Sequence, residues 1–138
     1  MRYLITILSF LFIFTGCSSK ISPDEEASVV EAARAWLSLV DENKYEASWT
    51  ACAAFLKKEV EKKRWVDTLT EIRKPKGALV SRQVTSTEYR TDLPNAVLGK
   101  YLIIKFKTSF ANQPAAVESI TQMREKDGIW RVVGYQLN

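Results

Sequence analysis

The hydrophobic positions in the first half of the chain repeat with the period of an α-helix. After the polar run Ser22–Glu26, apolar side chains recur three and four residues apart, at Val29, Val30, Ala33, Trp36, Leu37 and Val40. Ser22 can cap a helix whose first turn holds one proline and three acidic residues, which suit the positive end of the helix dipole. The pattern predicts a helix over residues 23–41.

Two further helices are predicted before the chain changes character. Aromatic and apolar positions at helical spacing over residues 45–56 indicate a second, shorter helix. A third is predicted over residues 58–72, and Pro75-Lys76-Gly77 ends it. Residues 57–64 include charges of opposite sign four positions apart, so we expect a solvated face there and not a binding patch.

From Leu79 onward the apolar positions alternate, as in strands. Residues 79–90 are predicted to be extended, and residues 100–110 give the clearest strand, with apolar positions on one face and lysines on the other. Two more strands are predicted at 117–125 and 129–137, after a turn at 111–114. Asp127-Gly128 between them predicts a two-residue hairpin turn with positive φ.

This order of elements predicts an α+β fold in which three N-terminal helices pack on one face of a four-stranded antiparallel sheet. The apolar face of residues 100–110 has to be covered, and we expect Trp36, Trp49 and Trp65 to cover it. One compact core is sufficient for a chain of this size. We therefore expect residues 23–138 to form a single α+β domain.

The first seventeen residues follow a different pattern. Met1-Arg2 precedes an almost wholly apolar run that ends at Phe14, and small residues then lead to Cys17, which is the order of a secretory signal. The run is shorter than the roughly 20 residues that cross a bilayer. Phe14-Thr15-Gly16-Cys17 resembles the bacterial lipobox, whose cysteine is lipidated and becomes the first residue. An ordinary signal peptide with an incidental cysteine is the alternative.

The lipobox resemblance implies a lipoprotein signal peptide at residues 1–16, lipid attachment at Cys17 and a short tether at 17–22. A diacylglyceryl thioether with a third, amide-linked acyl chain such as palmitate would give stable anchoring, because one chain alone binds membranes only marginally. Ser18 follows Cys17 where an aspartate would favour retention in the inner membrane. We therefore expect a cell-envelope protein on the periplasmic face of the outer membrane. Its expected partners are the membrane, through the lipid on Cys17, and an envelope protein, a lipid or a cell-wall fragment.

Composition narrows the chemistry further. The chain has 20 basic and 16 acidic side chains, and removing residues 1–16 takes away one arginine and leaves 19 against 16. This mildly basic balance suits anionic lipid or cell-wall surfaces, and no nucleic-acid partner is expected. The chain has no histidine, which excludes Ser-His-Asp and Cys-His pairs and histidine-bearing zinc sites. We predict no catalytic residue, no metal site and no cofactor, and expect a protein that is not an enzyme.

The second cysteine, Cys52, has no partner in the chain if Cys17 is acylated. It lies between two alanines on the apolar side of the second predicted helix. A buried structural thiol is therefore the expected role.

Three segments carry a family resemblance: "WLSLVDENKYEASW" (36–49), "KKRWVDTLTEIRKPKG" (62–77) and "GKYLIIKFKTSFANQPAAVESITQMREKDGIWRVVGY" (99–135). Together they are similar to the bacterial domain-of-unknown-function family four-thousand-and-nineteen. The resemblance implies a small exported or lipid-anchored domain with a curved sheet wrapped around helices, of the cystatin-like or nuclear-transport-factor-two-like type. It carries no catalytic residue across to this chain.

The leading functional hypothesis is a non-catalytic binding or interaction module, and the alternative is a small-ligand-binding or enzymatic pocket inside the α+β cone. For an enzyme, a tyrosine could hold an oxyanion while a carboxylate moves a proton, which makes Glu88 and Glu118 bare candidates. Arginines could converge on an anionic ligand, with Arg73 and Arg131 among them, although salt bridges are the simpler expectation. The residues predicted for a pocket or surface binding site are Arg82, Arg90, Tyr89, Tyr101 and Trp130.

Overall fold

A computed structural model describes residues 20–138, so the predictions for residues 1–16 and Cys17 lie outside the described residues. The first helix, α1 (Pro23–Asp41), has the predicted bounds. The Ser22 side chain accepts a hydrogen bond from the Glu25 backbone N–H at 3.2 Å, as expected of an N-cap. The buried side of α1 is the predicted stripe, which includes Val29, Trp36 and Val40.

The prediction of one helix over residues 45–56 was wrong, because the structure has two short helices there, α2 (Tyr45–Thr50) and α3 (Ala54–Glu59). Ala53 between them is extended, and its backbone N–H donates to the Val132 carbonyl of the last strand at 2.9 Å. The next N–H, of Ala54, donates to Glu125 Oε1 at 2.6 Å, which satisfies one open donor at the start of α3. Contacts with the sheet therefore break the helical run.

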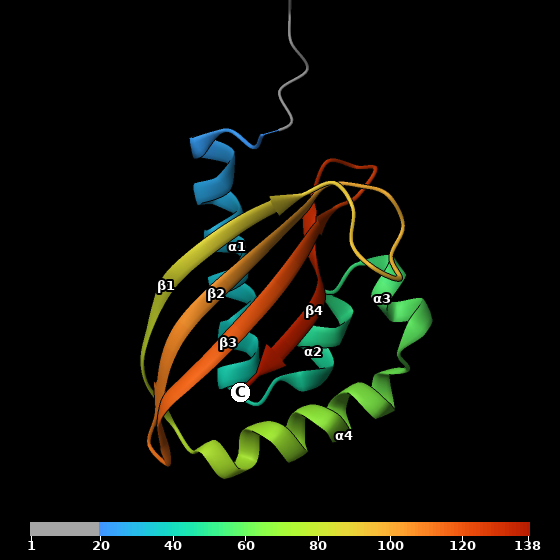
Figure 1. The fold of residues 1–138 in the computed structure, drawn as a ribbon. Helices are drawn as coiled ribbons and strands as arrows, with labels where there is room; N and C mark the ends of the chain where they lie inside the picture. Colours follow the sequence, from blue (N-terminus) through green and yellow to red (C-terminus); the bar gives the residue numbers. More distant parts are fainter. Residues whose placement is uncertain (1–19) are drawn as a thin grey trace, which may run out of the picture.

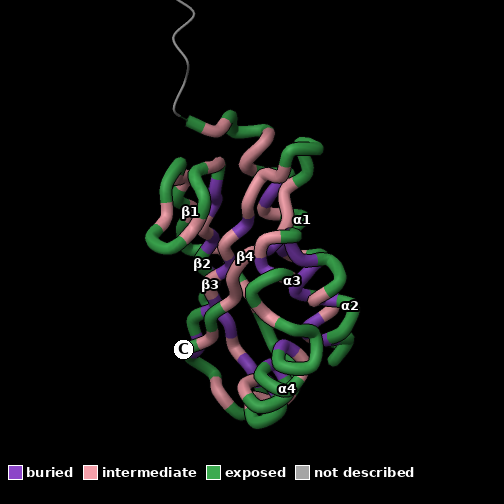
Figure 2. Tube along the Cα trace, turned by 90° about the vertical axis from the view of Figure 1, so that its right-hand side faces the viewer, coloured by how far each residue is buried: buried purple, intermediate pink, exposed green. Residues whose placement is uncertain are grey.

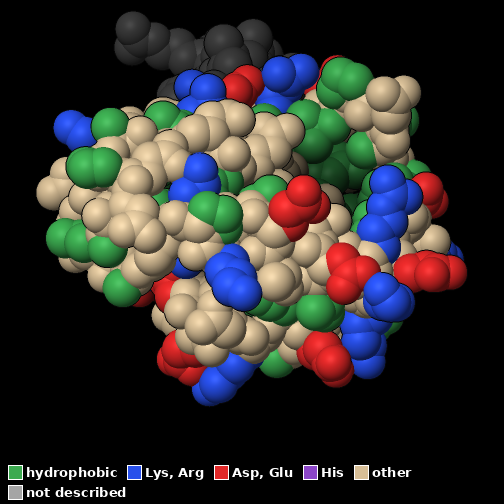
Figure 3. Space-filling model, turned by 90° about the horizontal axis from the view of Figure 1, so that it is seen from below, with side chains coloured by type: hydrophobic (Ala, Val, Ile, Leu, Met, Phe, Trp, Pro, Cys, Tyr) green, Lys and Arg blue, Asp and Glu red, His purple; other side chains and the backbone are tan. Residues whose placement is uncertain are grey.

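The last helix, α4 (Lys62–Arg73), begins four residues later than predicted. Val60 is extended and its carbonyl accepts a hydrogen bond from Trp49 Nε1 at 2.8 Å, so residue 60 serves as a contact between helices instead of continuing one. A 3₁₀ turn, η1 (Lys74–Lys76), follows α4, and Gly77 then adopts a φ of 76°. The face of the molecule that includes α4 carries basic and acidic side chains interspersed (Figure 3).

Four antiparallel strands form one sheet in the order of the sequence, which confirms the predicted meander. They are β1 (Leu79–Arg90), β2 (Tyr101–Phe110), β3 (Gln113–Arg124) and β4 (Trp130–Leu137). Figure 1 shows the sheet bending as it passes in front of the helices, with β1 at one edge and β4 at the other. The structure is thus α+β, and the four α-helices found within residues 20–138 precede the sheet, where three were predicted.

Two turns differ from the predictions. β3 begins at Gln113, four residues early, because Gln113 already pairs with Phe110 across a tight turn. Pro114 is tolerated there because it lies where the β2–β3 register shifts, and proline fits bulges better than regular ladders. At the other end of β3 the Glu125 N–H donates to the Ile129 carbonyl, so the loop has three residues, and Gly128 has positive φ but Asp127 does not.

The core lies between the helices and one face of the sheet. On β2 the side chains of this face are all buried, as their alternation predicted: Leu102, Ile104, Phe106, Thr108 and Phe110. Figure 2 shows the buried residues gathered where α1, α2 and α4 face the strands. Trp36 and Trp65 are buried against this face and meet edge to face, with ring centroids 6.2 Å apart, while Trp49 is partly buried. Among residues 20–138, no helix is long and apolar enough to cross a membrane.

Candidate functional site

A group of charged and hydroxyl side chains is buried where the C-terminal end of α1 meets α4 and the sheet. Its members come from six different elements, and we refer to them as the Asp41 cluster: Asp41, Arg73, Arg82, Thr108, Glu118 and Tyr135. Alternation along the strands puts Arg82, Thr108 and Glu118 on the helix-facing side of the sheet. The strand register therefore brings these three polar side chains together within a layer that is otherwise apolar.

Arg82 connects the two carboxylates of the cluster. Its Nη1 and Nη2 donate to the two oxygens of Asp41 at 2.7 and 2.9 Å, and its Nε donates to Glu118 Oε1 at 2.7 Å. This paired geometry toward Asp41 is the bidentate fork in which arginine holds carboxylates most strongly. Arg82 thereby ties β1 to the end of α1 and to β3.

Glu118 is fully buried, with a side-chain exposure of 0%. Oε1 also accepts from the Thr108 hydroxyl at 2.6 Å, and Oε2 accepts from the Tyr135 hydroxyl at 2.5 Å. Glu118, one of the two bare candidates for a catalytic carboxylate, therefore faces the interior and not a pocket open to solvent. Each of its oxygens is occupied, which is the condition under which a buried carboxylate is tolerated.

Arg73 completes the cluster from the end of α4. Its Nη2 donates to Asp41 Oδ1 at 2.8 Å, its Nη1 donates to the Tyr135 hydroxyl at 3.3 Å, and its guanidinium lies 4.6 Å from the centre of the Phe110 ring. Its Nε is buried without a hydrogen-bond partner among the described residues. A shallow hollow of about 340 Å³ lies beside Arg73, lined also by Asp41, Asn43 and Lys74.

The surroundings of the cluster favour the charged forms of Asp41 and Arg82 and the neutral form of Tyr135. Burial opposes the ionisation of Asp41, but hydrogen bonds from Arg82 and Arg73 outweigh it and lower the pKa of Asp41. Burial likewise opposes the charge on Arg82, but hydrogen bonds to Asp41 and Glu118 raise its pKa. Burial raises the pKa of Tyr135, and the nearby charge of Glu118 raises it further. Every carboxylate oxygen already accepts a hydrogen bond, so the cluster is suited to fixing elements in place.

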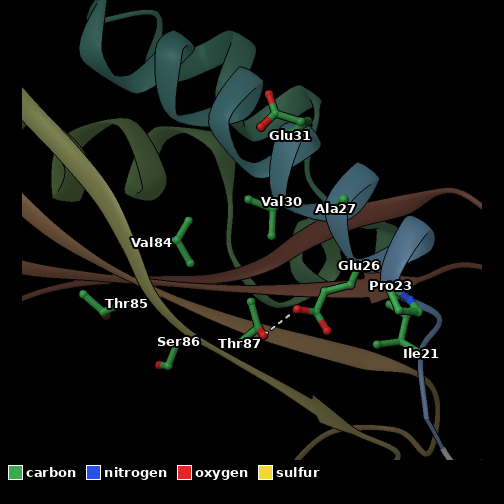
Figure 4. A pocket seen from close by; sticks show the side chains of 10 residues that line it. All are labelled: Ile21, Pro23, Glu26, Ala27, Val30, Glu31, Val84, Thr85, Ser86 and Thr87. Carbon is green, nitrogen blue, oxygen red and sulfur yellow. Dashed lines mark hydrogen bonds between the residues drawn. The ribbon is translucent and has the colours of Figure 1, made fainter.

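A second feature lies at the opposite end of α1. A hollow of about 650 Å³ runs between the first turns of α1 and the middle of β1 (Figure 4). We call it the α1–β1 groove; it is lined by Ile21, Pro23, Glu26, Ala27, Val30, Glu31, Val84, Thr85, Ser86 and Thr87. α1 packs mainly against β2, β3 and β4 and makes little contact with the edge strand β1, so the groove stays open.

The groove combines an apolar floor with a polar rim. Figure 4 shows Val30 and Glu26 reaching from α1 toward β1, and Thr87 reaching back to Glu26. The Thr87 hydroxyl donates to Glu26 Oε1 at 2.7 Å. Glu31 is largely exposed and lies 3.4 Å from the Nε of Arg34. Such a surface suits a ligand with both apolar and hydrogen-bonding groups.

The five predicted binding residues do not converge on one site. Arg82 belongs to the Asp41 cluster, whereas Arg90 lies at the other end of β1 and pairs with Glu88 at 3.2 Å and Asp92 at 3.6 Å. Glu88 is exposed, and neither it nor Arg90 lines the α1–β1 groove or the hollow beside Arg73. Tyr89 packs against the core from the same strand as Arg82.

Tyr101 and Trp130 also lie apart from each other. Tyr101 is buried, and its hydroxyl donates to the Val97 carbonyl, which closes the loop before β2. Trp130 is partly buried and its Nε1 donates to Glu25 Oε1 at 3.1 Å. It borders a separate, mainly apolar hollow of about 320 Å³ between α1 and β4, with Ala32 and Ala35 opposite.

The sequence analysis predicted Arg82 as a binding residue but did not predict that it pairs with Asp41 and Glu118. It also did not predict that Thr108 and Tyr135 donate hydrogen bonds to Glu118. One signal could have found them. Arg82 and Glu118 both occupy helix-facing positions on their strands, with an apolar residue two positions away on either side. Opposite charges on the apolar faces of strands in one sheet predict a buried ion pair, because an unpaired charge there would be very unfavourable.

The remaining chemistry of the described residues is modest. No three acidic or cysteine side chains within residues 20–138 are grouped so that they could hold a metal ion. Cys52 is buried, and its thiol donates to the Ser48 carbonyl at 3.2 Å, as expected of a structural cysteine. Burial raises the pKa of Cys52 to about 12, so it is protonated at neutral pH.

The fold and the two features define a small α+β domain with an open antiparallel sheet. The chain belongs to the family described as "Protein of unknown function (DUF4019)", whose model matches residues 32–135. The match begins within α1 and ends within β4, and it includes every member of the Asp41 cluster. Comparison with curated proteins and with solved structures gives no significant match.

Proposed function

We propose that this protein is a lipid-anchored binding module of the bacterial cell envelope and that it has no catalytic activity. The observation that carries the non-catalytic part is the saturation of the Asp41 cluster. Both oxygens of Asp41 and both oxygens of Glu118 accept hydrogen bonds from arginine, threonine or tyrosine. A general acid or base needs an oxygen that is free to exchange a proton with its substrate. The oxygens of Asp41 and Glu118 instead all accept hydrogen bonds within the cluster.

The anchoring part of the proposal is supported by the distance along the chain between Cys17 and the domain. The groove-lining Ile21 follows Cys17 by four residues, which can span at most about 14 Å when fully extended. A lipid on Cys17 would therefore keep the groove end of α1 close to a bilayer. The Asp41 cluster lies at the other end of α1, about 28 Å along a 19-residue helix.

The proposed location is the periplasmic face of the outer membrane, on the ground that Ser18 follows Cys17. The proposed partners are an envelope protein, a lipid or a cell-wall fragment, and no nucleic acid. We also propose that the fold is of the cystatin-like or nuclear-transport-factor-two-like type. Helices preceding and covering one face of a bent antiparallel sheet support that assignment.

The anchor is tested by Cys17→Ser, with Cys52→Ala as the matched cysteine control. We expect the wild type and Cys52→Ala to appear in the membrane fraction with the mass of a triacylated chain cleaved before residue 17. Cys17→Ser should lose both the added mass and the membrane association. Unchanged mass and fractionation of Cys17→Ser would show that the chain is not anchored through this residue.

The binding role is tested by chemical cross-linking in intact cells followed by purification of the protein in detergent. A binding module should give the same cross-linked partner in repeated experiments, and Cys17→Ser should lose it if the anchor delivers the domain to that partner. Repeated recovery of the protein without any cross-linked envelope component would argue against a binding role.

A further inference from the structure

We propose that the α1–β1 groove binds an extended peptide segment, which adds as a strand to the open edge of β1 and places an apolar side chain and a lysine or arginine in the groove. The inference rests on the proposed function and deepens it, because it assigns the partner of the binding module to one chemical class, a protein chain. It follows from the backbone, shape and charge of the groove.

The backbone of β1 provides the template for such a strand. β1 pairs with β2 along one side, and its other side is an edge of the sheet. The ladder shifts between Val84 and Ser86, but Ser86 to Arg90 then pair with β2 without interruption. A regular edge of this length offers alternating N–H and C=O groups to an incoming chain, which is the basis of recognition by strand addition.

The shape of the groove matches the side chains of an added strand. A new strand would lie about 4.8 Å from β1, and every second side chain would point toward the helix side of the sheet. The space there is the groove, whose apolar walls are Ala27 and Val30 of α1 and Val84 of β1. One apolar side chain of the incoming strand would therefore leave water and pack against these three residues.

The charges at the rim select the partner. Glu26 and Glu31 line the groove, and none of its ten lining residues is basic. Glu26 accepts a hydrogen bond from the Thr87 hydroxyl, and Glu31 is 74% exposed beside Arg34. A lysine or arginine on the incoming strand would be attracted to this rim, while a phosphate headgroup would be repelled. Pairing of two β1 edges from two copies would bring two acidic rims together, which disfavours self-association.

Hydrogen exchange of the full-length protein in detergent tests the inference directly. The probe is a short synthetic peptide that repeats valine-threonine-lysine-threonine, so that valine and lysine lie on the same face of an added strand, and the matched control peptide has glutamate in place of each lysine. We expect the lysine peptide to slow exchange of backbone amides within residues 84–90 and the glutamate peptide to leave them unchanged. Lack of protection in β1 at millimolar lysine peptide, or equal protection by both peptides, would overturn the inference.

Two exposed alanines on different sides of α1 provide matched variants. Ala27 lines the groove, whereas Ala32 lines the separate hollow beside β4. Ala27→Arg should fill the groove and add repulsion, weakening the lysine peptide by about tenfold or more, while Ala32→Arg should leave its affinity unchanged. Glu31→Gln should weaken it by about two- to fivefold, the range of an exposed charge pair. Equal losses in both arginine variants would place the peptide elsewhere and overturn the inference.

These results are separable from those for the proposed function. If the protein is membrane-anchored and yields a cross-linked partner but β1 gains no protection, strand addition fails and the binding module stands. If β1 is protected but Cys17→Ser fractionates like the wild type, the anchor fails and the groove assignment stands. A dimer that forms with rising concentration and protects β1 without any peptide would assign the edge to a second copy and overturn the inference.

Discussion

The two ends of α1 use polar residues in opposite ways. At its C-terminal end, Asp41 is enclosed by two arginines, and Glu118 behind it is fully buried. In its N-terminal half, Glu26 accepts a hydrogen bond from the Thr87 hydroxyl and Glu31 is mostly in water. One end therefore has its charges neutralised inside the protein, and the other leaves negative charge beside an open hollow.

The comparison indicates where stability and binding reside. Buried ion pairs are weak evidence for net stability, but removing one member leaves the other buried without a partner. The Asp41 cluster joins six elements, so its integrity decides how the helices sit on the sheet. The exposed rim residues of the α1–β1 groove make few such contacts, so we expect substitutions there to affect folding little and the proposed peptide binding more.

The largest expected effect on stability comes from removing a buried carboxylate of the Asp41 cluster. Glu118→Ala removes the partner of Arg82 Nε, Thr108 and Tyr135 and leaves buried positive charge uncompensated. We expect the free energy of unfolding to fall by about 3–5 kcal/mol, measured by urea denaturation. Glu59→Ala, at an exposed glutamate of α3, should change it by less than about 0.5 kcal/mol. Similar losses in the two variants would show that the cluster does not organise the fold.

The second-largest effect on stability is expected for a substitution of Asp41, and it depends on pH. Because its pKa is lowered in the folded protein, its contribution is complete above the unfolded value of about 3.9 and is lost as the pH falls through the folded pKa. Asp41→Asn should cost about 1.5–3 kcal/mol near neutral pH, the range for hydrogen bonds to charged groups, and should flatten the loss of stability below about pH 4. Urea denaturation across pH 2–7 measures both.

The exposed Asp67 of α4 supplies the control for that experiment. It pairs with Lys63 at 2.5 Å, but the two side chains are 62% and 85% exposed. Asp67→Asn should retain the acid-dependent loss of the wild type. An Asp41→Asn profile that runs parallel to the wild type at every pH would mean that Asp41 does not titrate as the structure indicates.

Much of the fold could be predicted from patterns within single elements. The bounds of α1 followed from its cap and its apolar stripe, and the buried face of β2 followed from strict alternation. The second helix could not be predicted correctly, because the Ala53 N–H pairs with Val132, 79 positions away in the chain. Local spacing contains no information about such a contact.

The candidate site was less predictable for the same reason. Arg82 was chosen as a residue type able to hold an anion, and the anions that it holds are Asp41 and Glu118 of this chain. Arg90, on the same strand, pairs with neighbours in sequence. Residue type indicated what an arginine can bind, but only the register and the helix position decided which carboxylate reaches it.

A smaller effect on the free energy of unfolding is expected for a substitution in the α1–β1 groove. Thr87→Val removes the hydroxyl that donates to Glu26 while keeping a β-branched side chain that suits a strand. The loss should be about 0.5–1.5 kcal/mol, the usual net value of one hydrogen bond, since Glu26 can turn to water. Thr87→Ser, which keeps the hydroxyl at the same position, is the comparison for the change of side chain alone. A loss at Thr87 as large as that for Glu118→Ala would erase the contrast between the two ends.

The smallest effect on folding is expected for Glu31→Gln, and it sharpens the comparison most. The Glu31 side chain is 74% exposed and its contact with Arg34 lies within one helix, so the free energy of unfolding should change by less than about 0.5 kcal/mol. The same substitution should weaken the valine-lysine peptide, because it removes charge from the groove rim. A residue that matters for binding but not for folding is what an interaction surface requires. If Glu31→Gln instead destabilised the protein and left peptide binding intact, the acidic rim would have to be reassigned to folding.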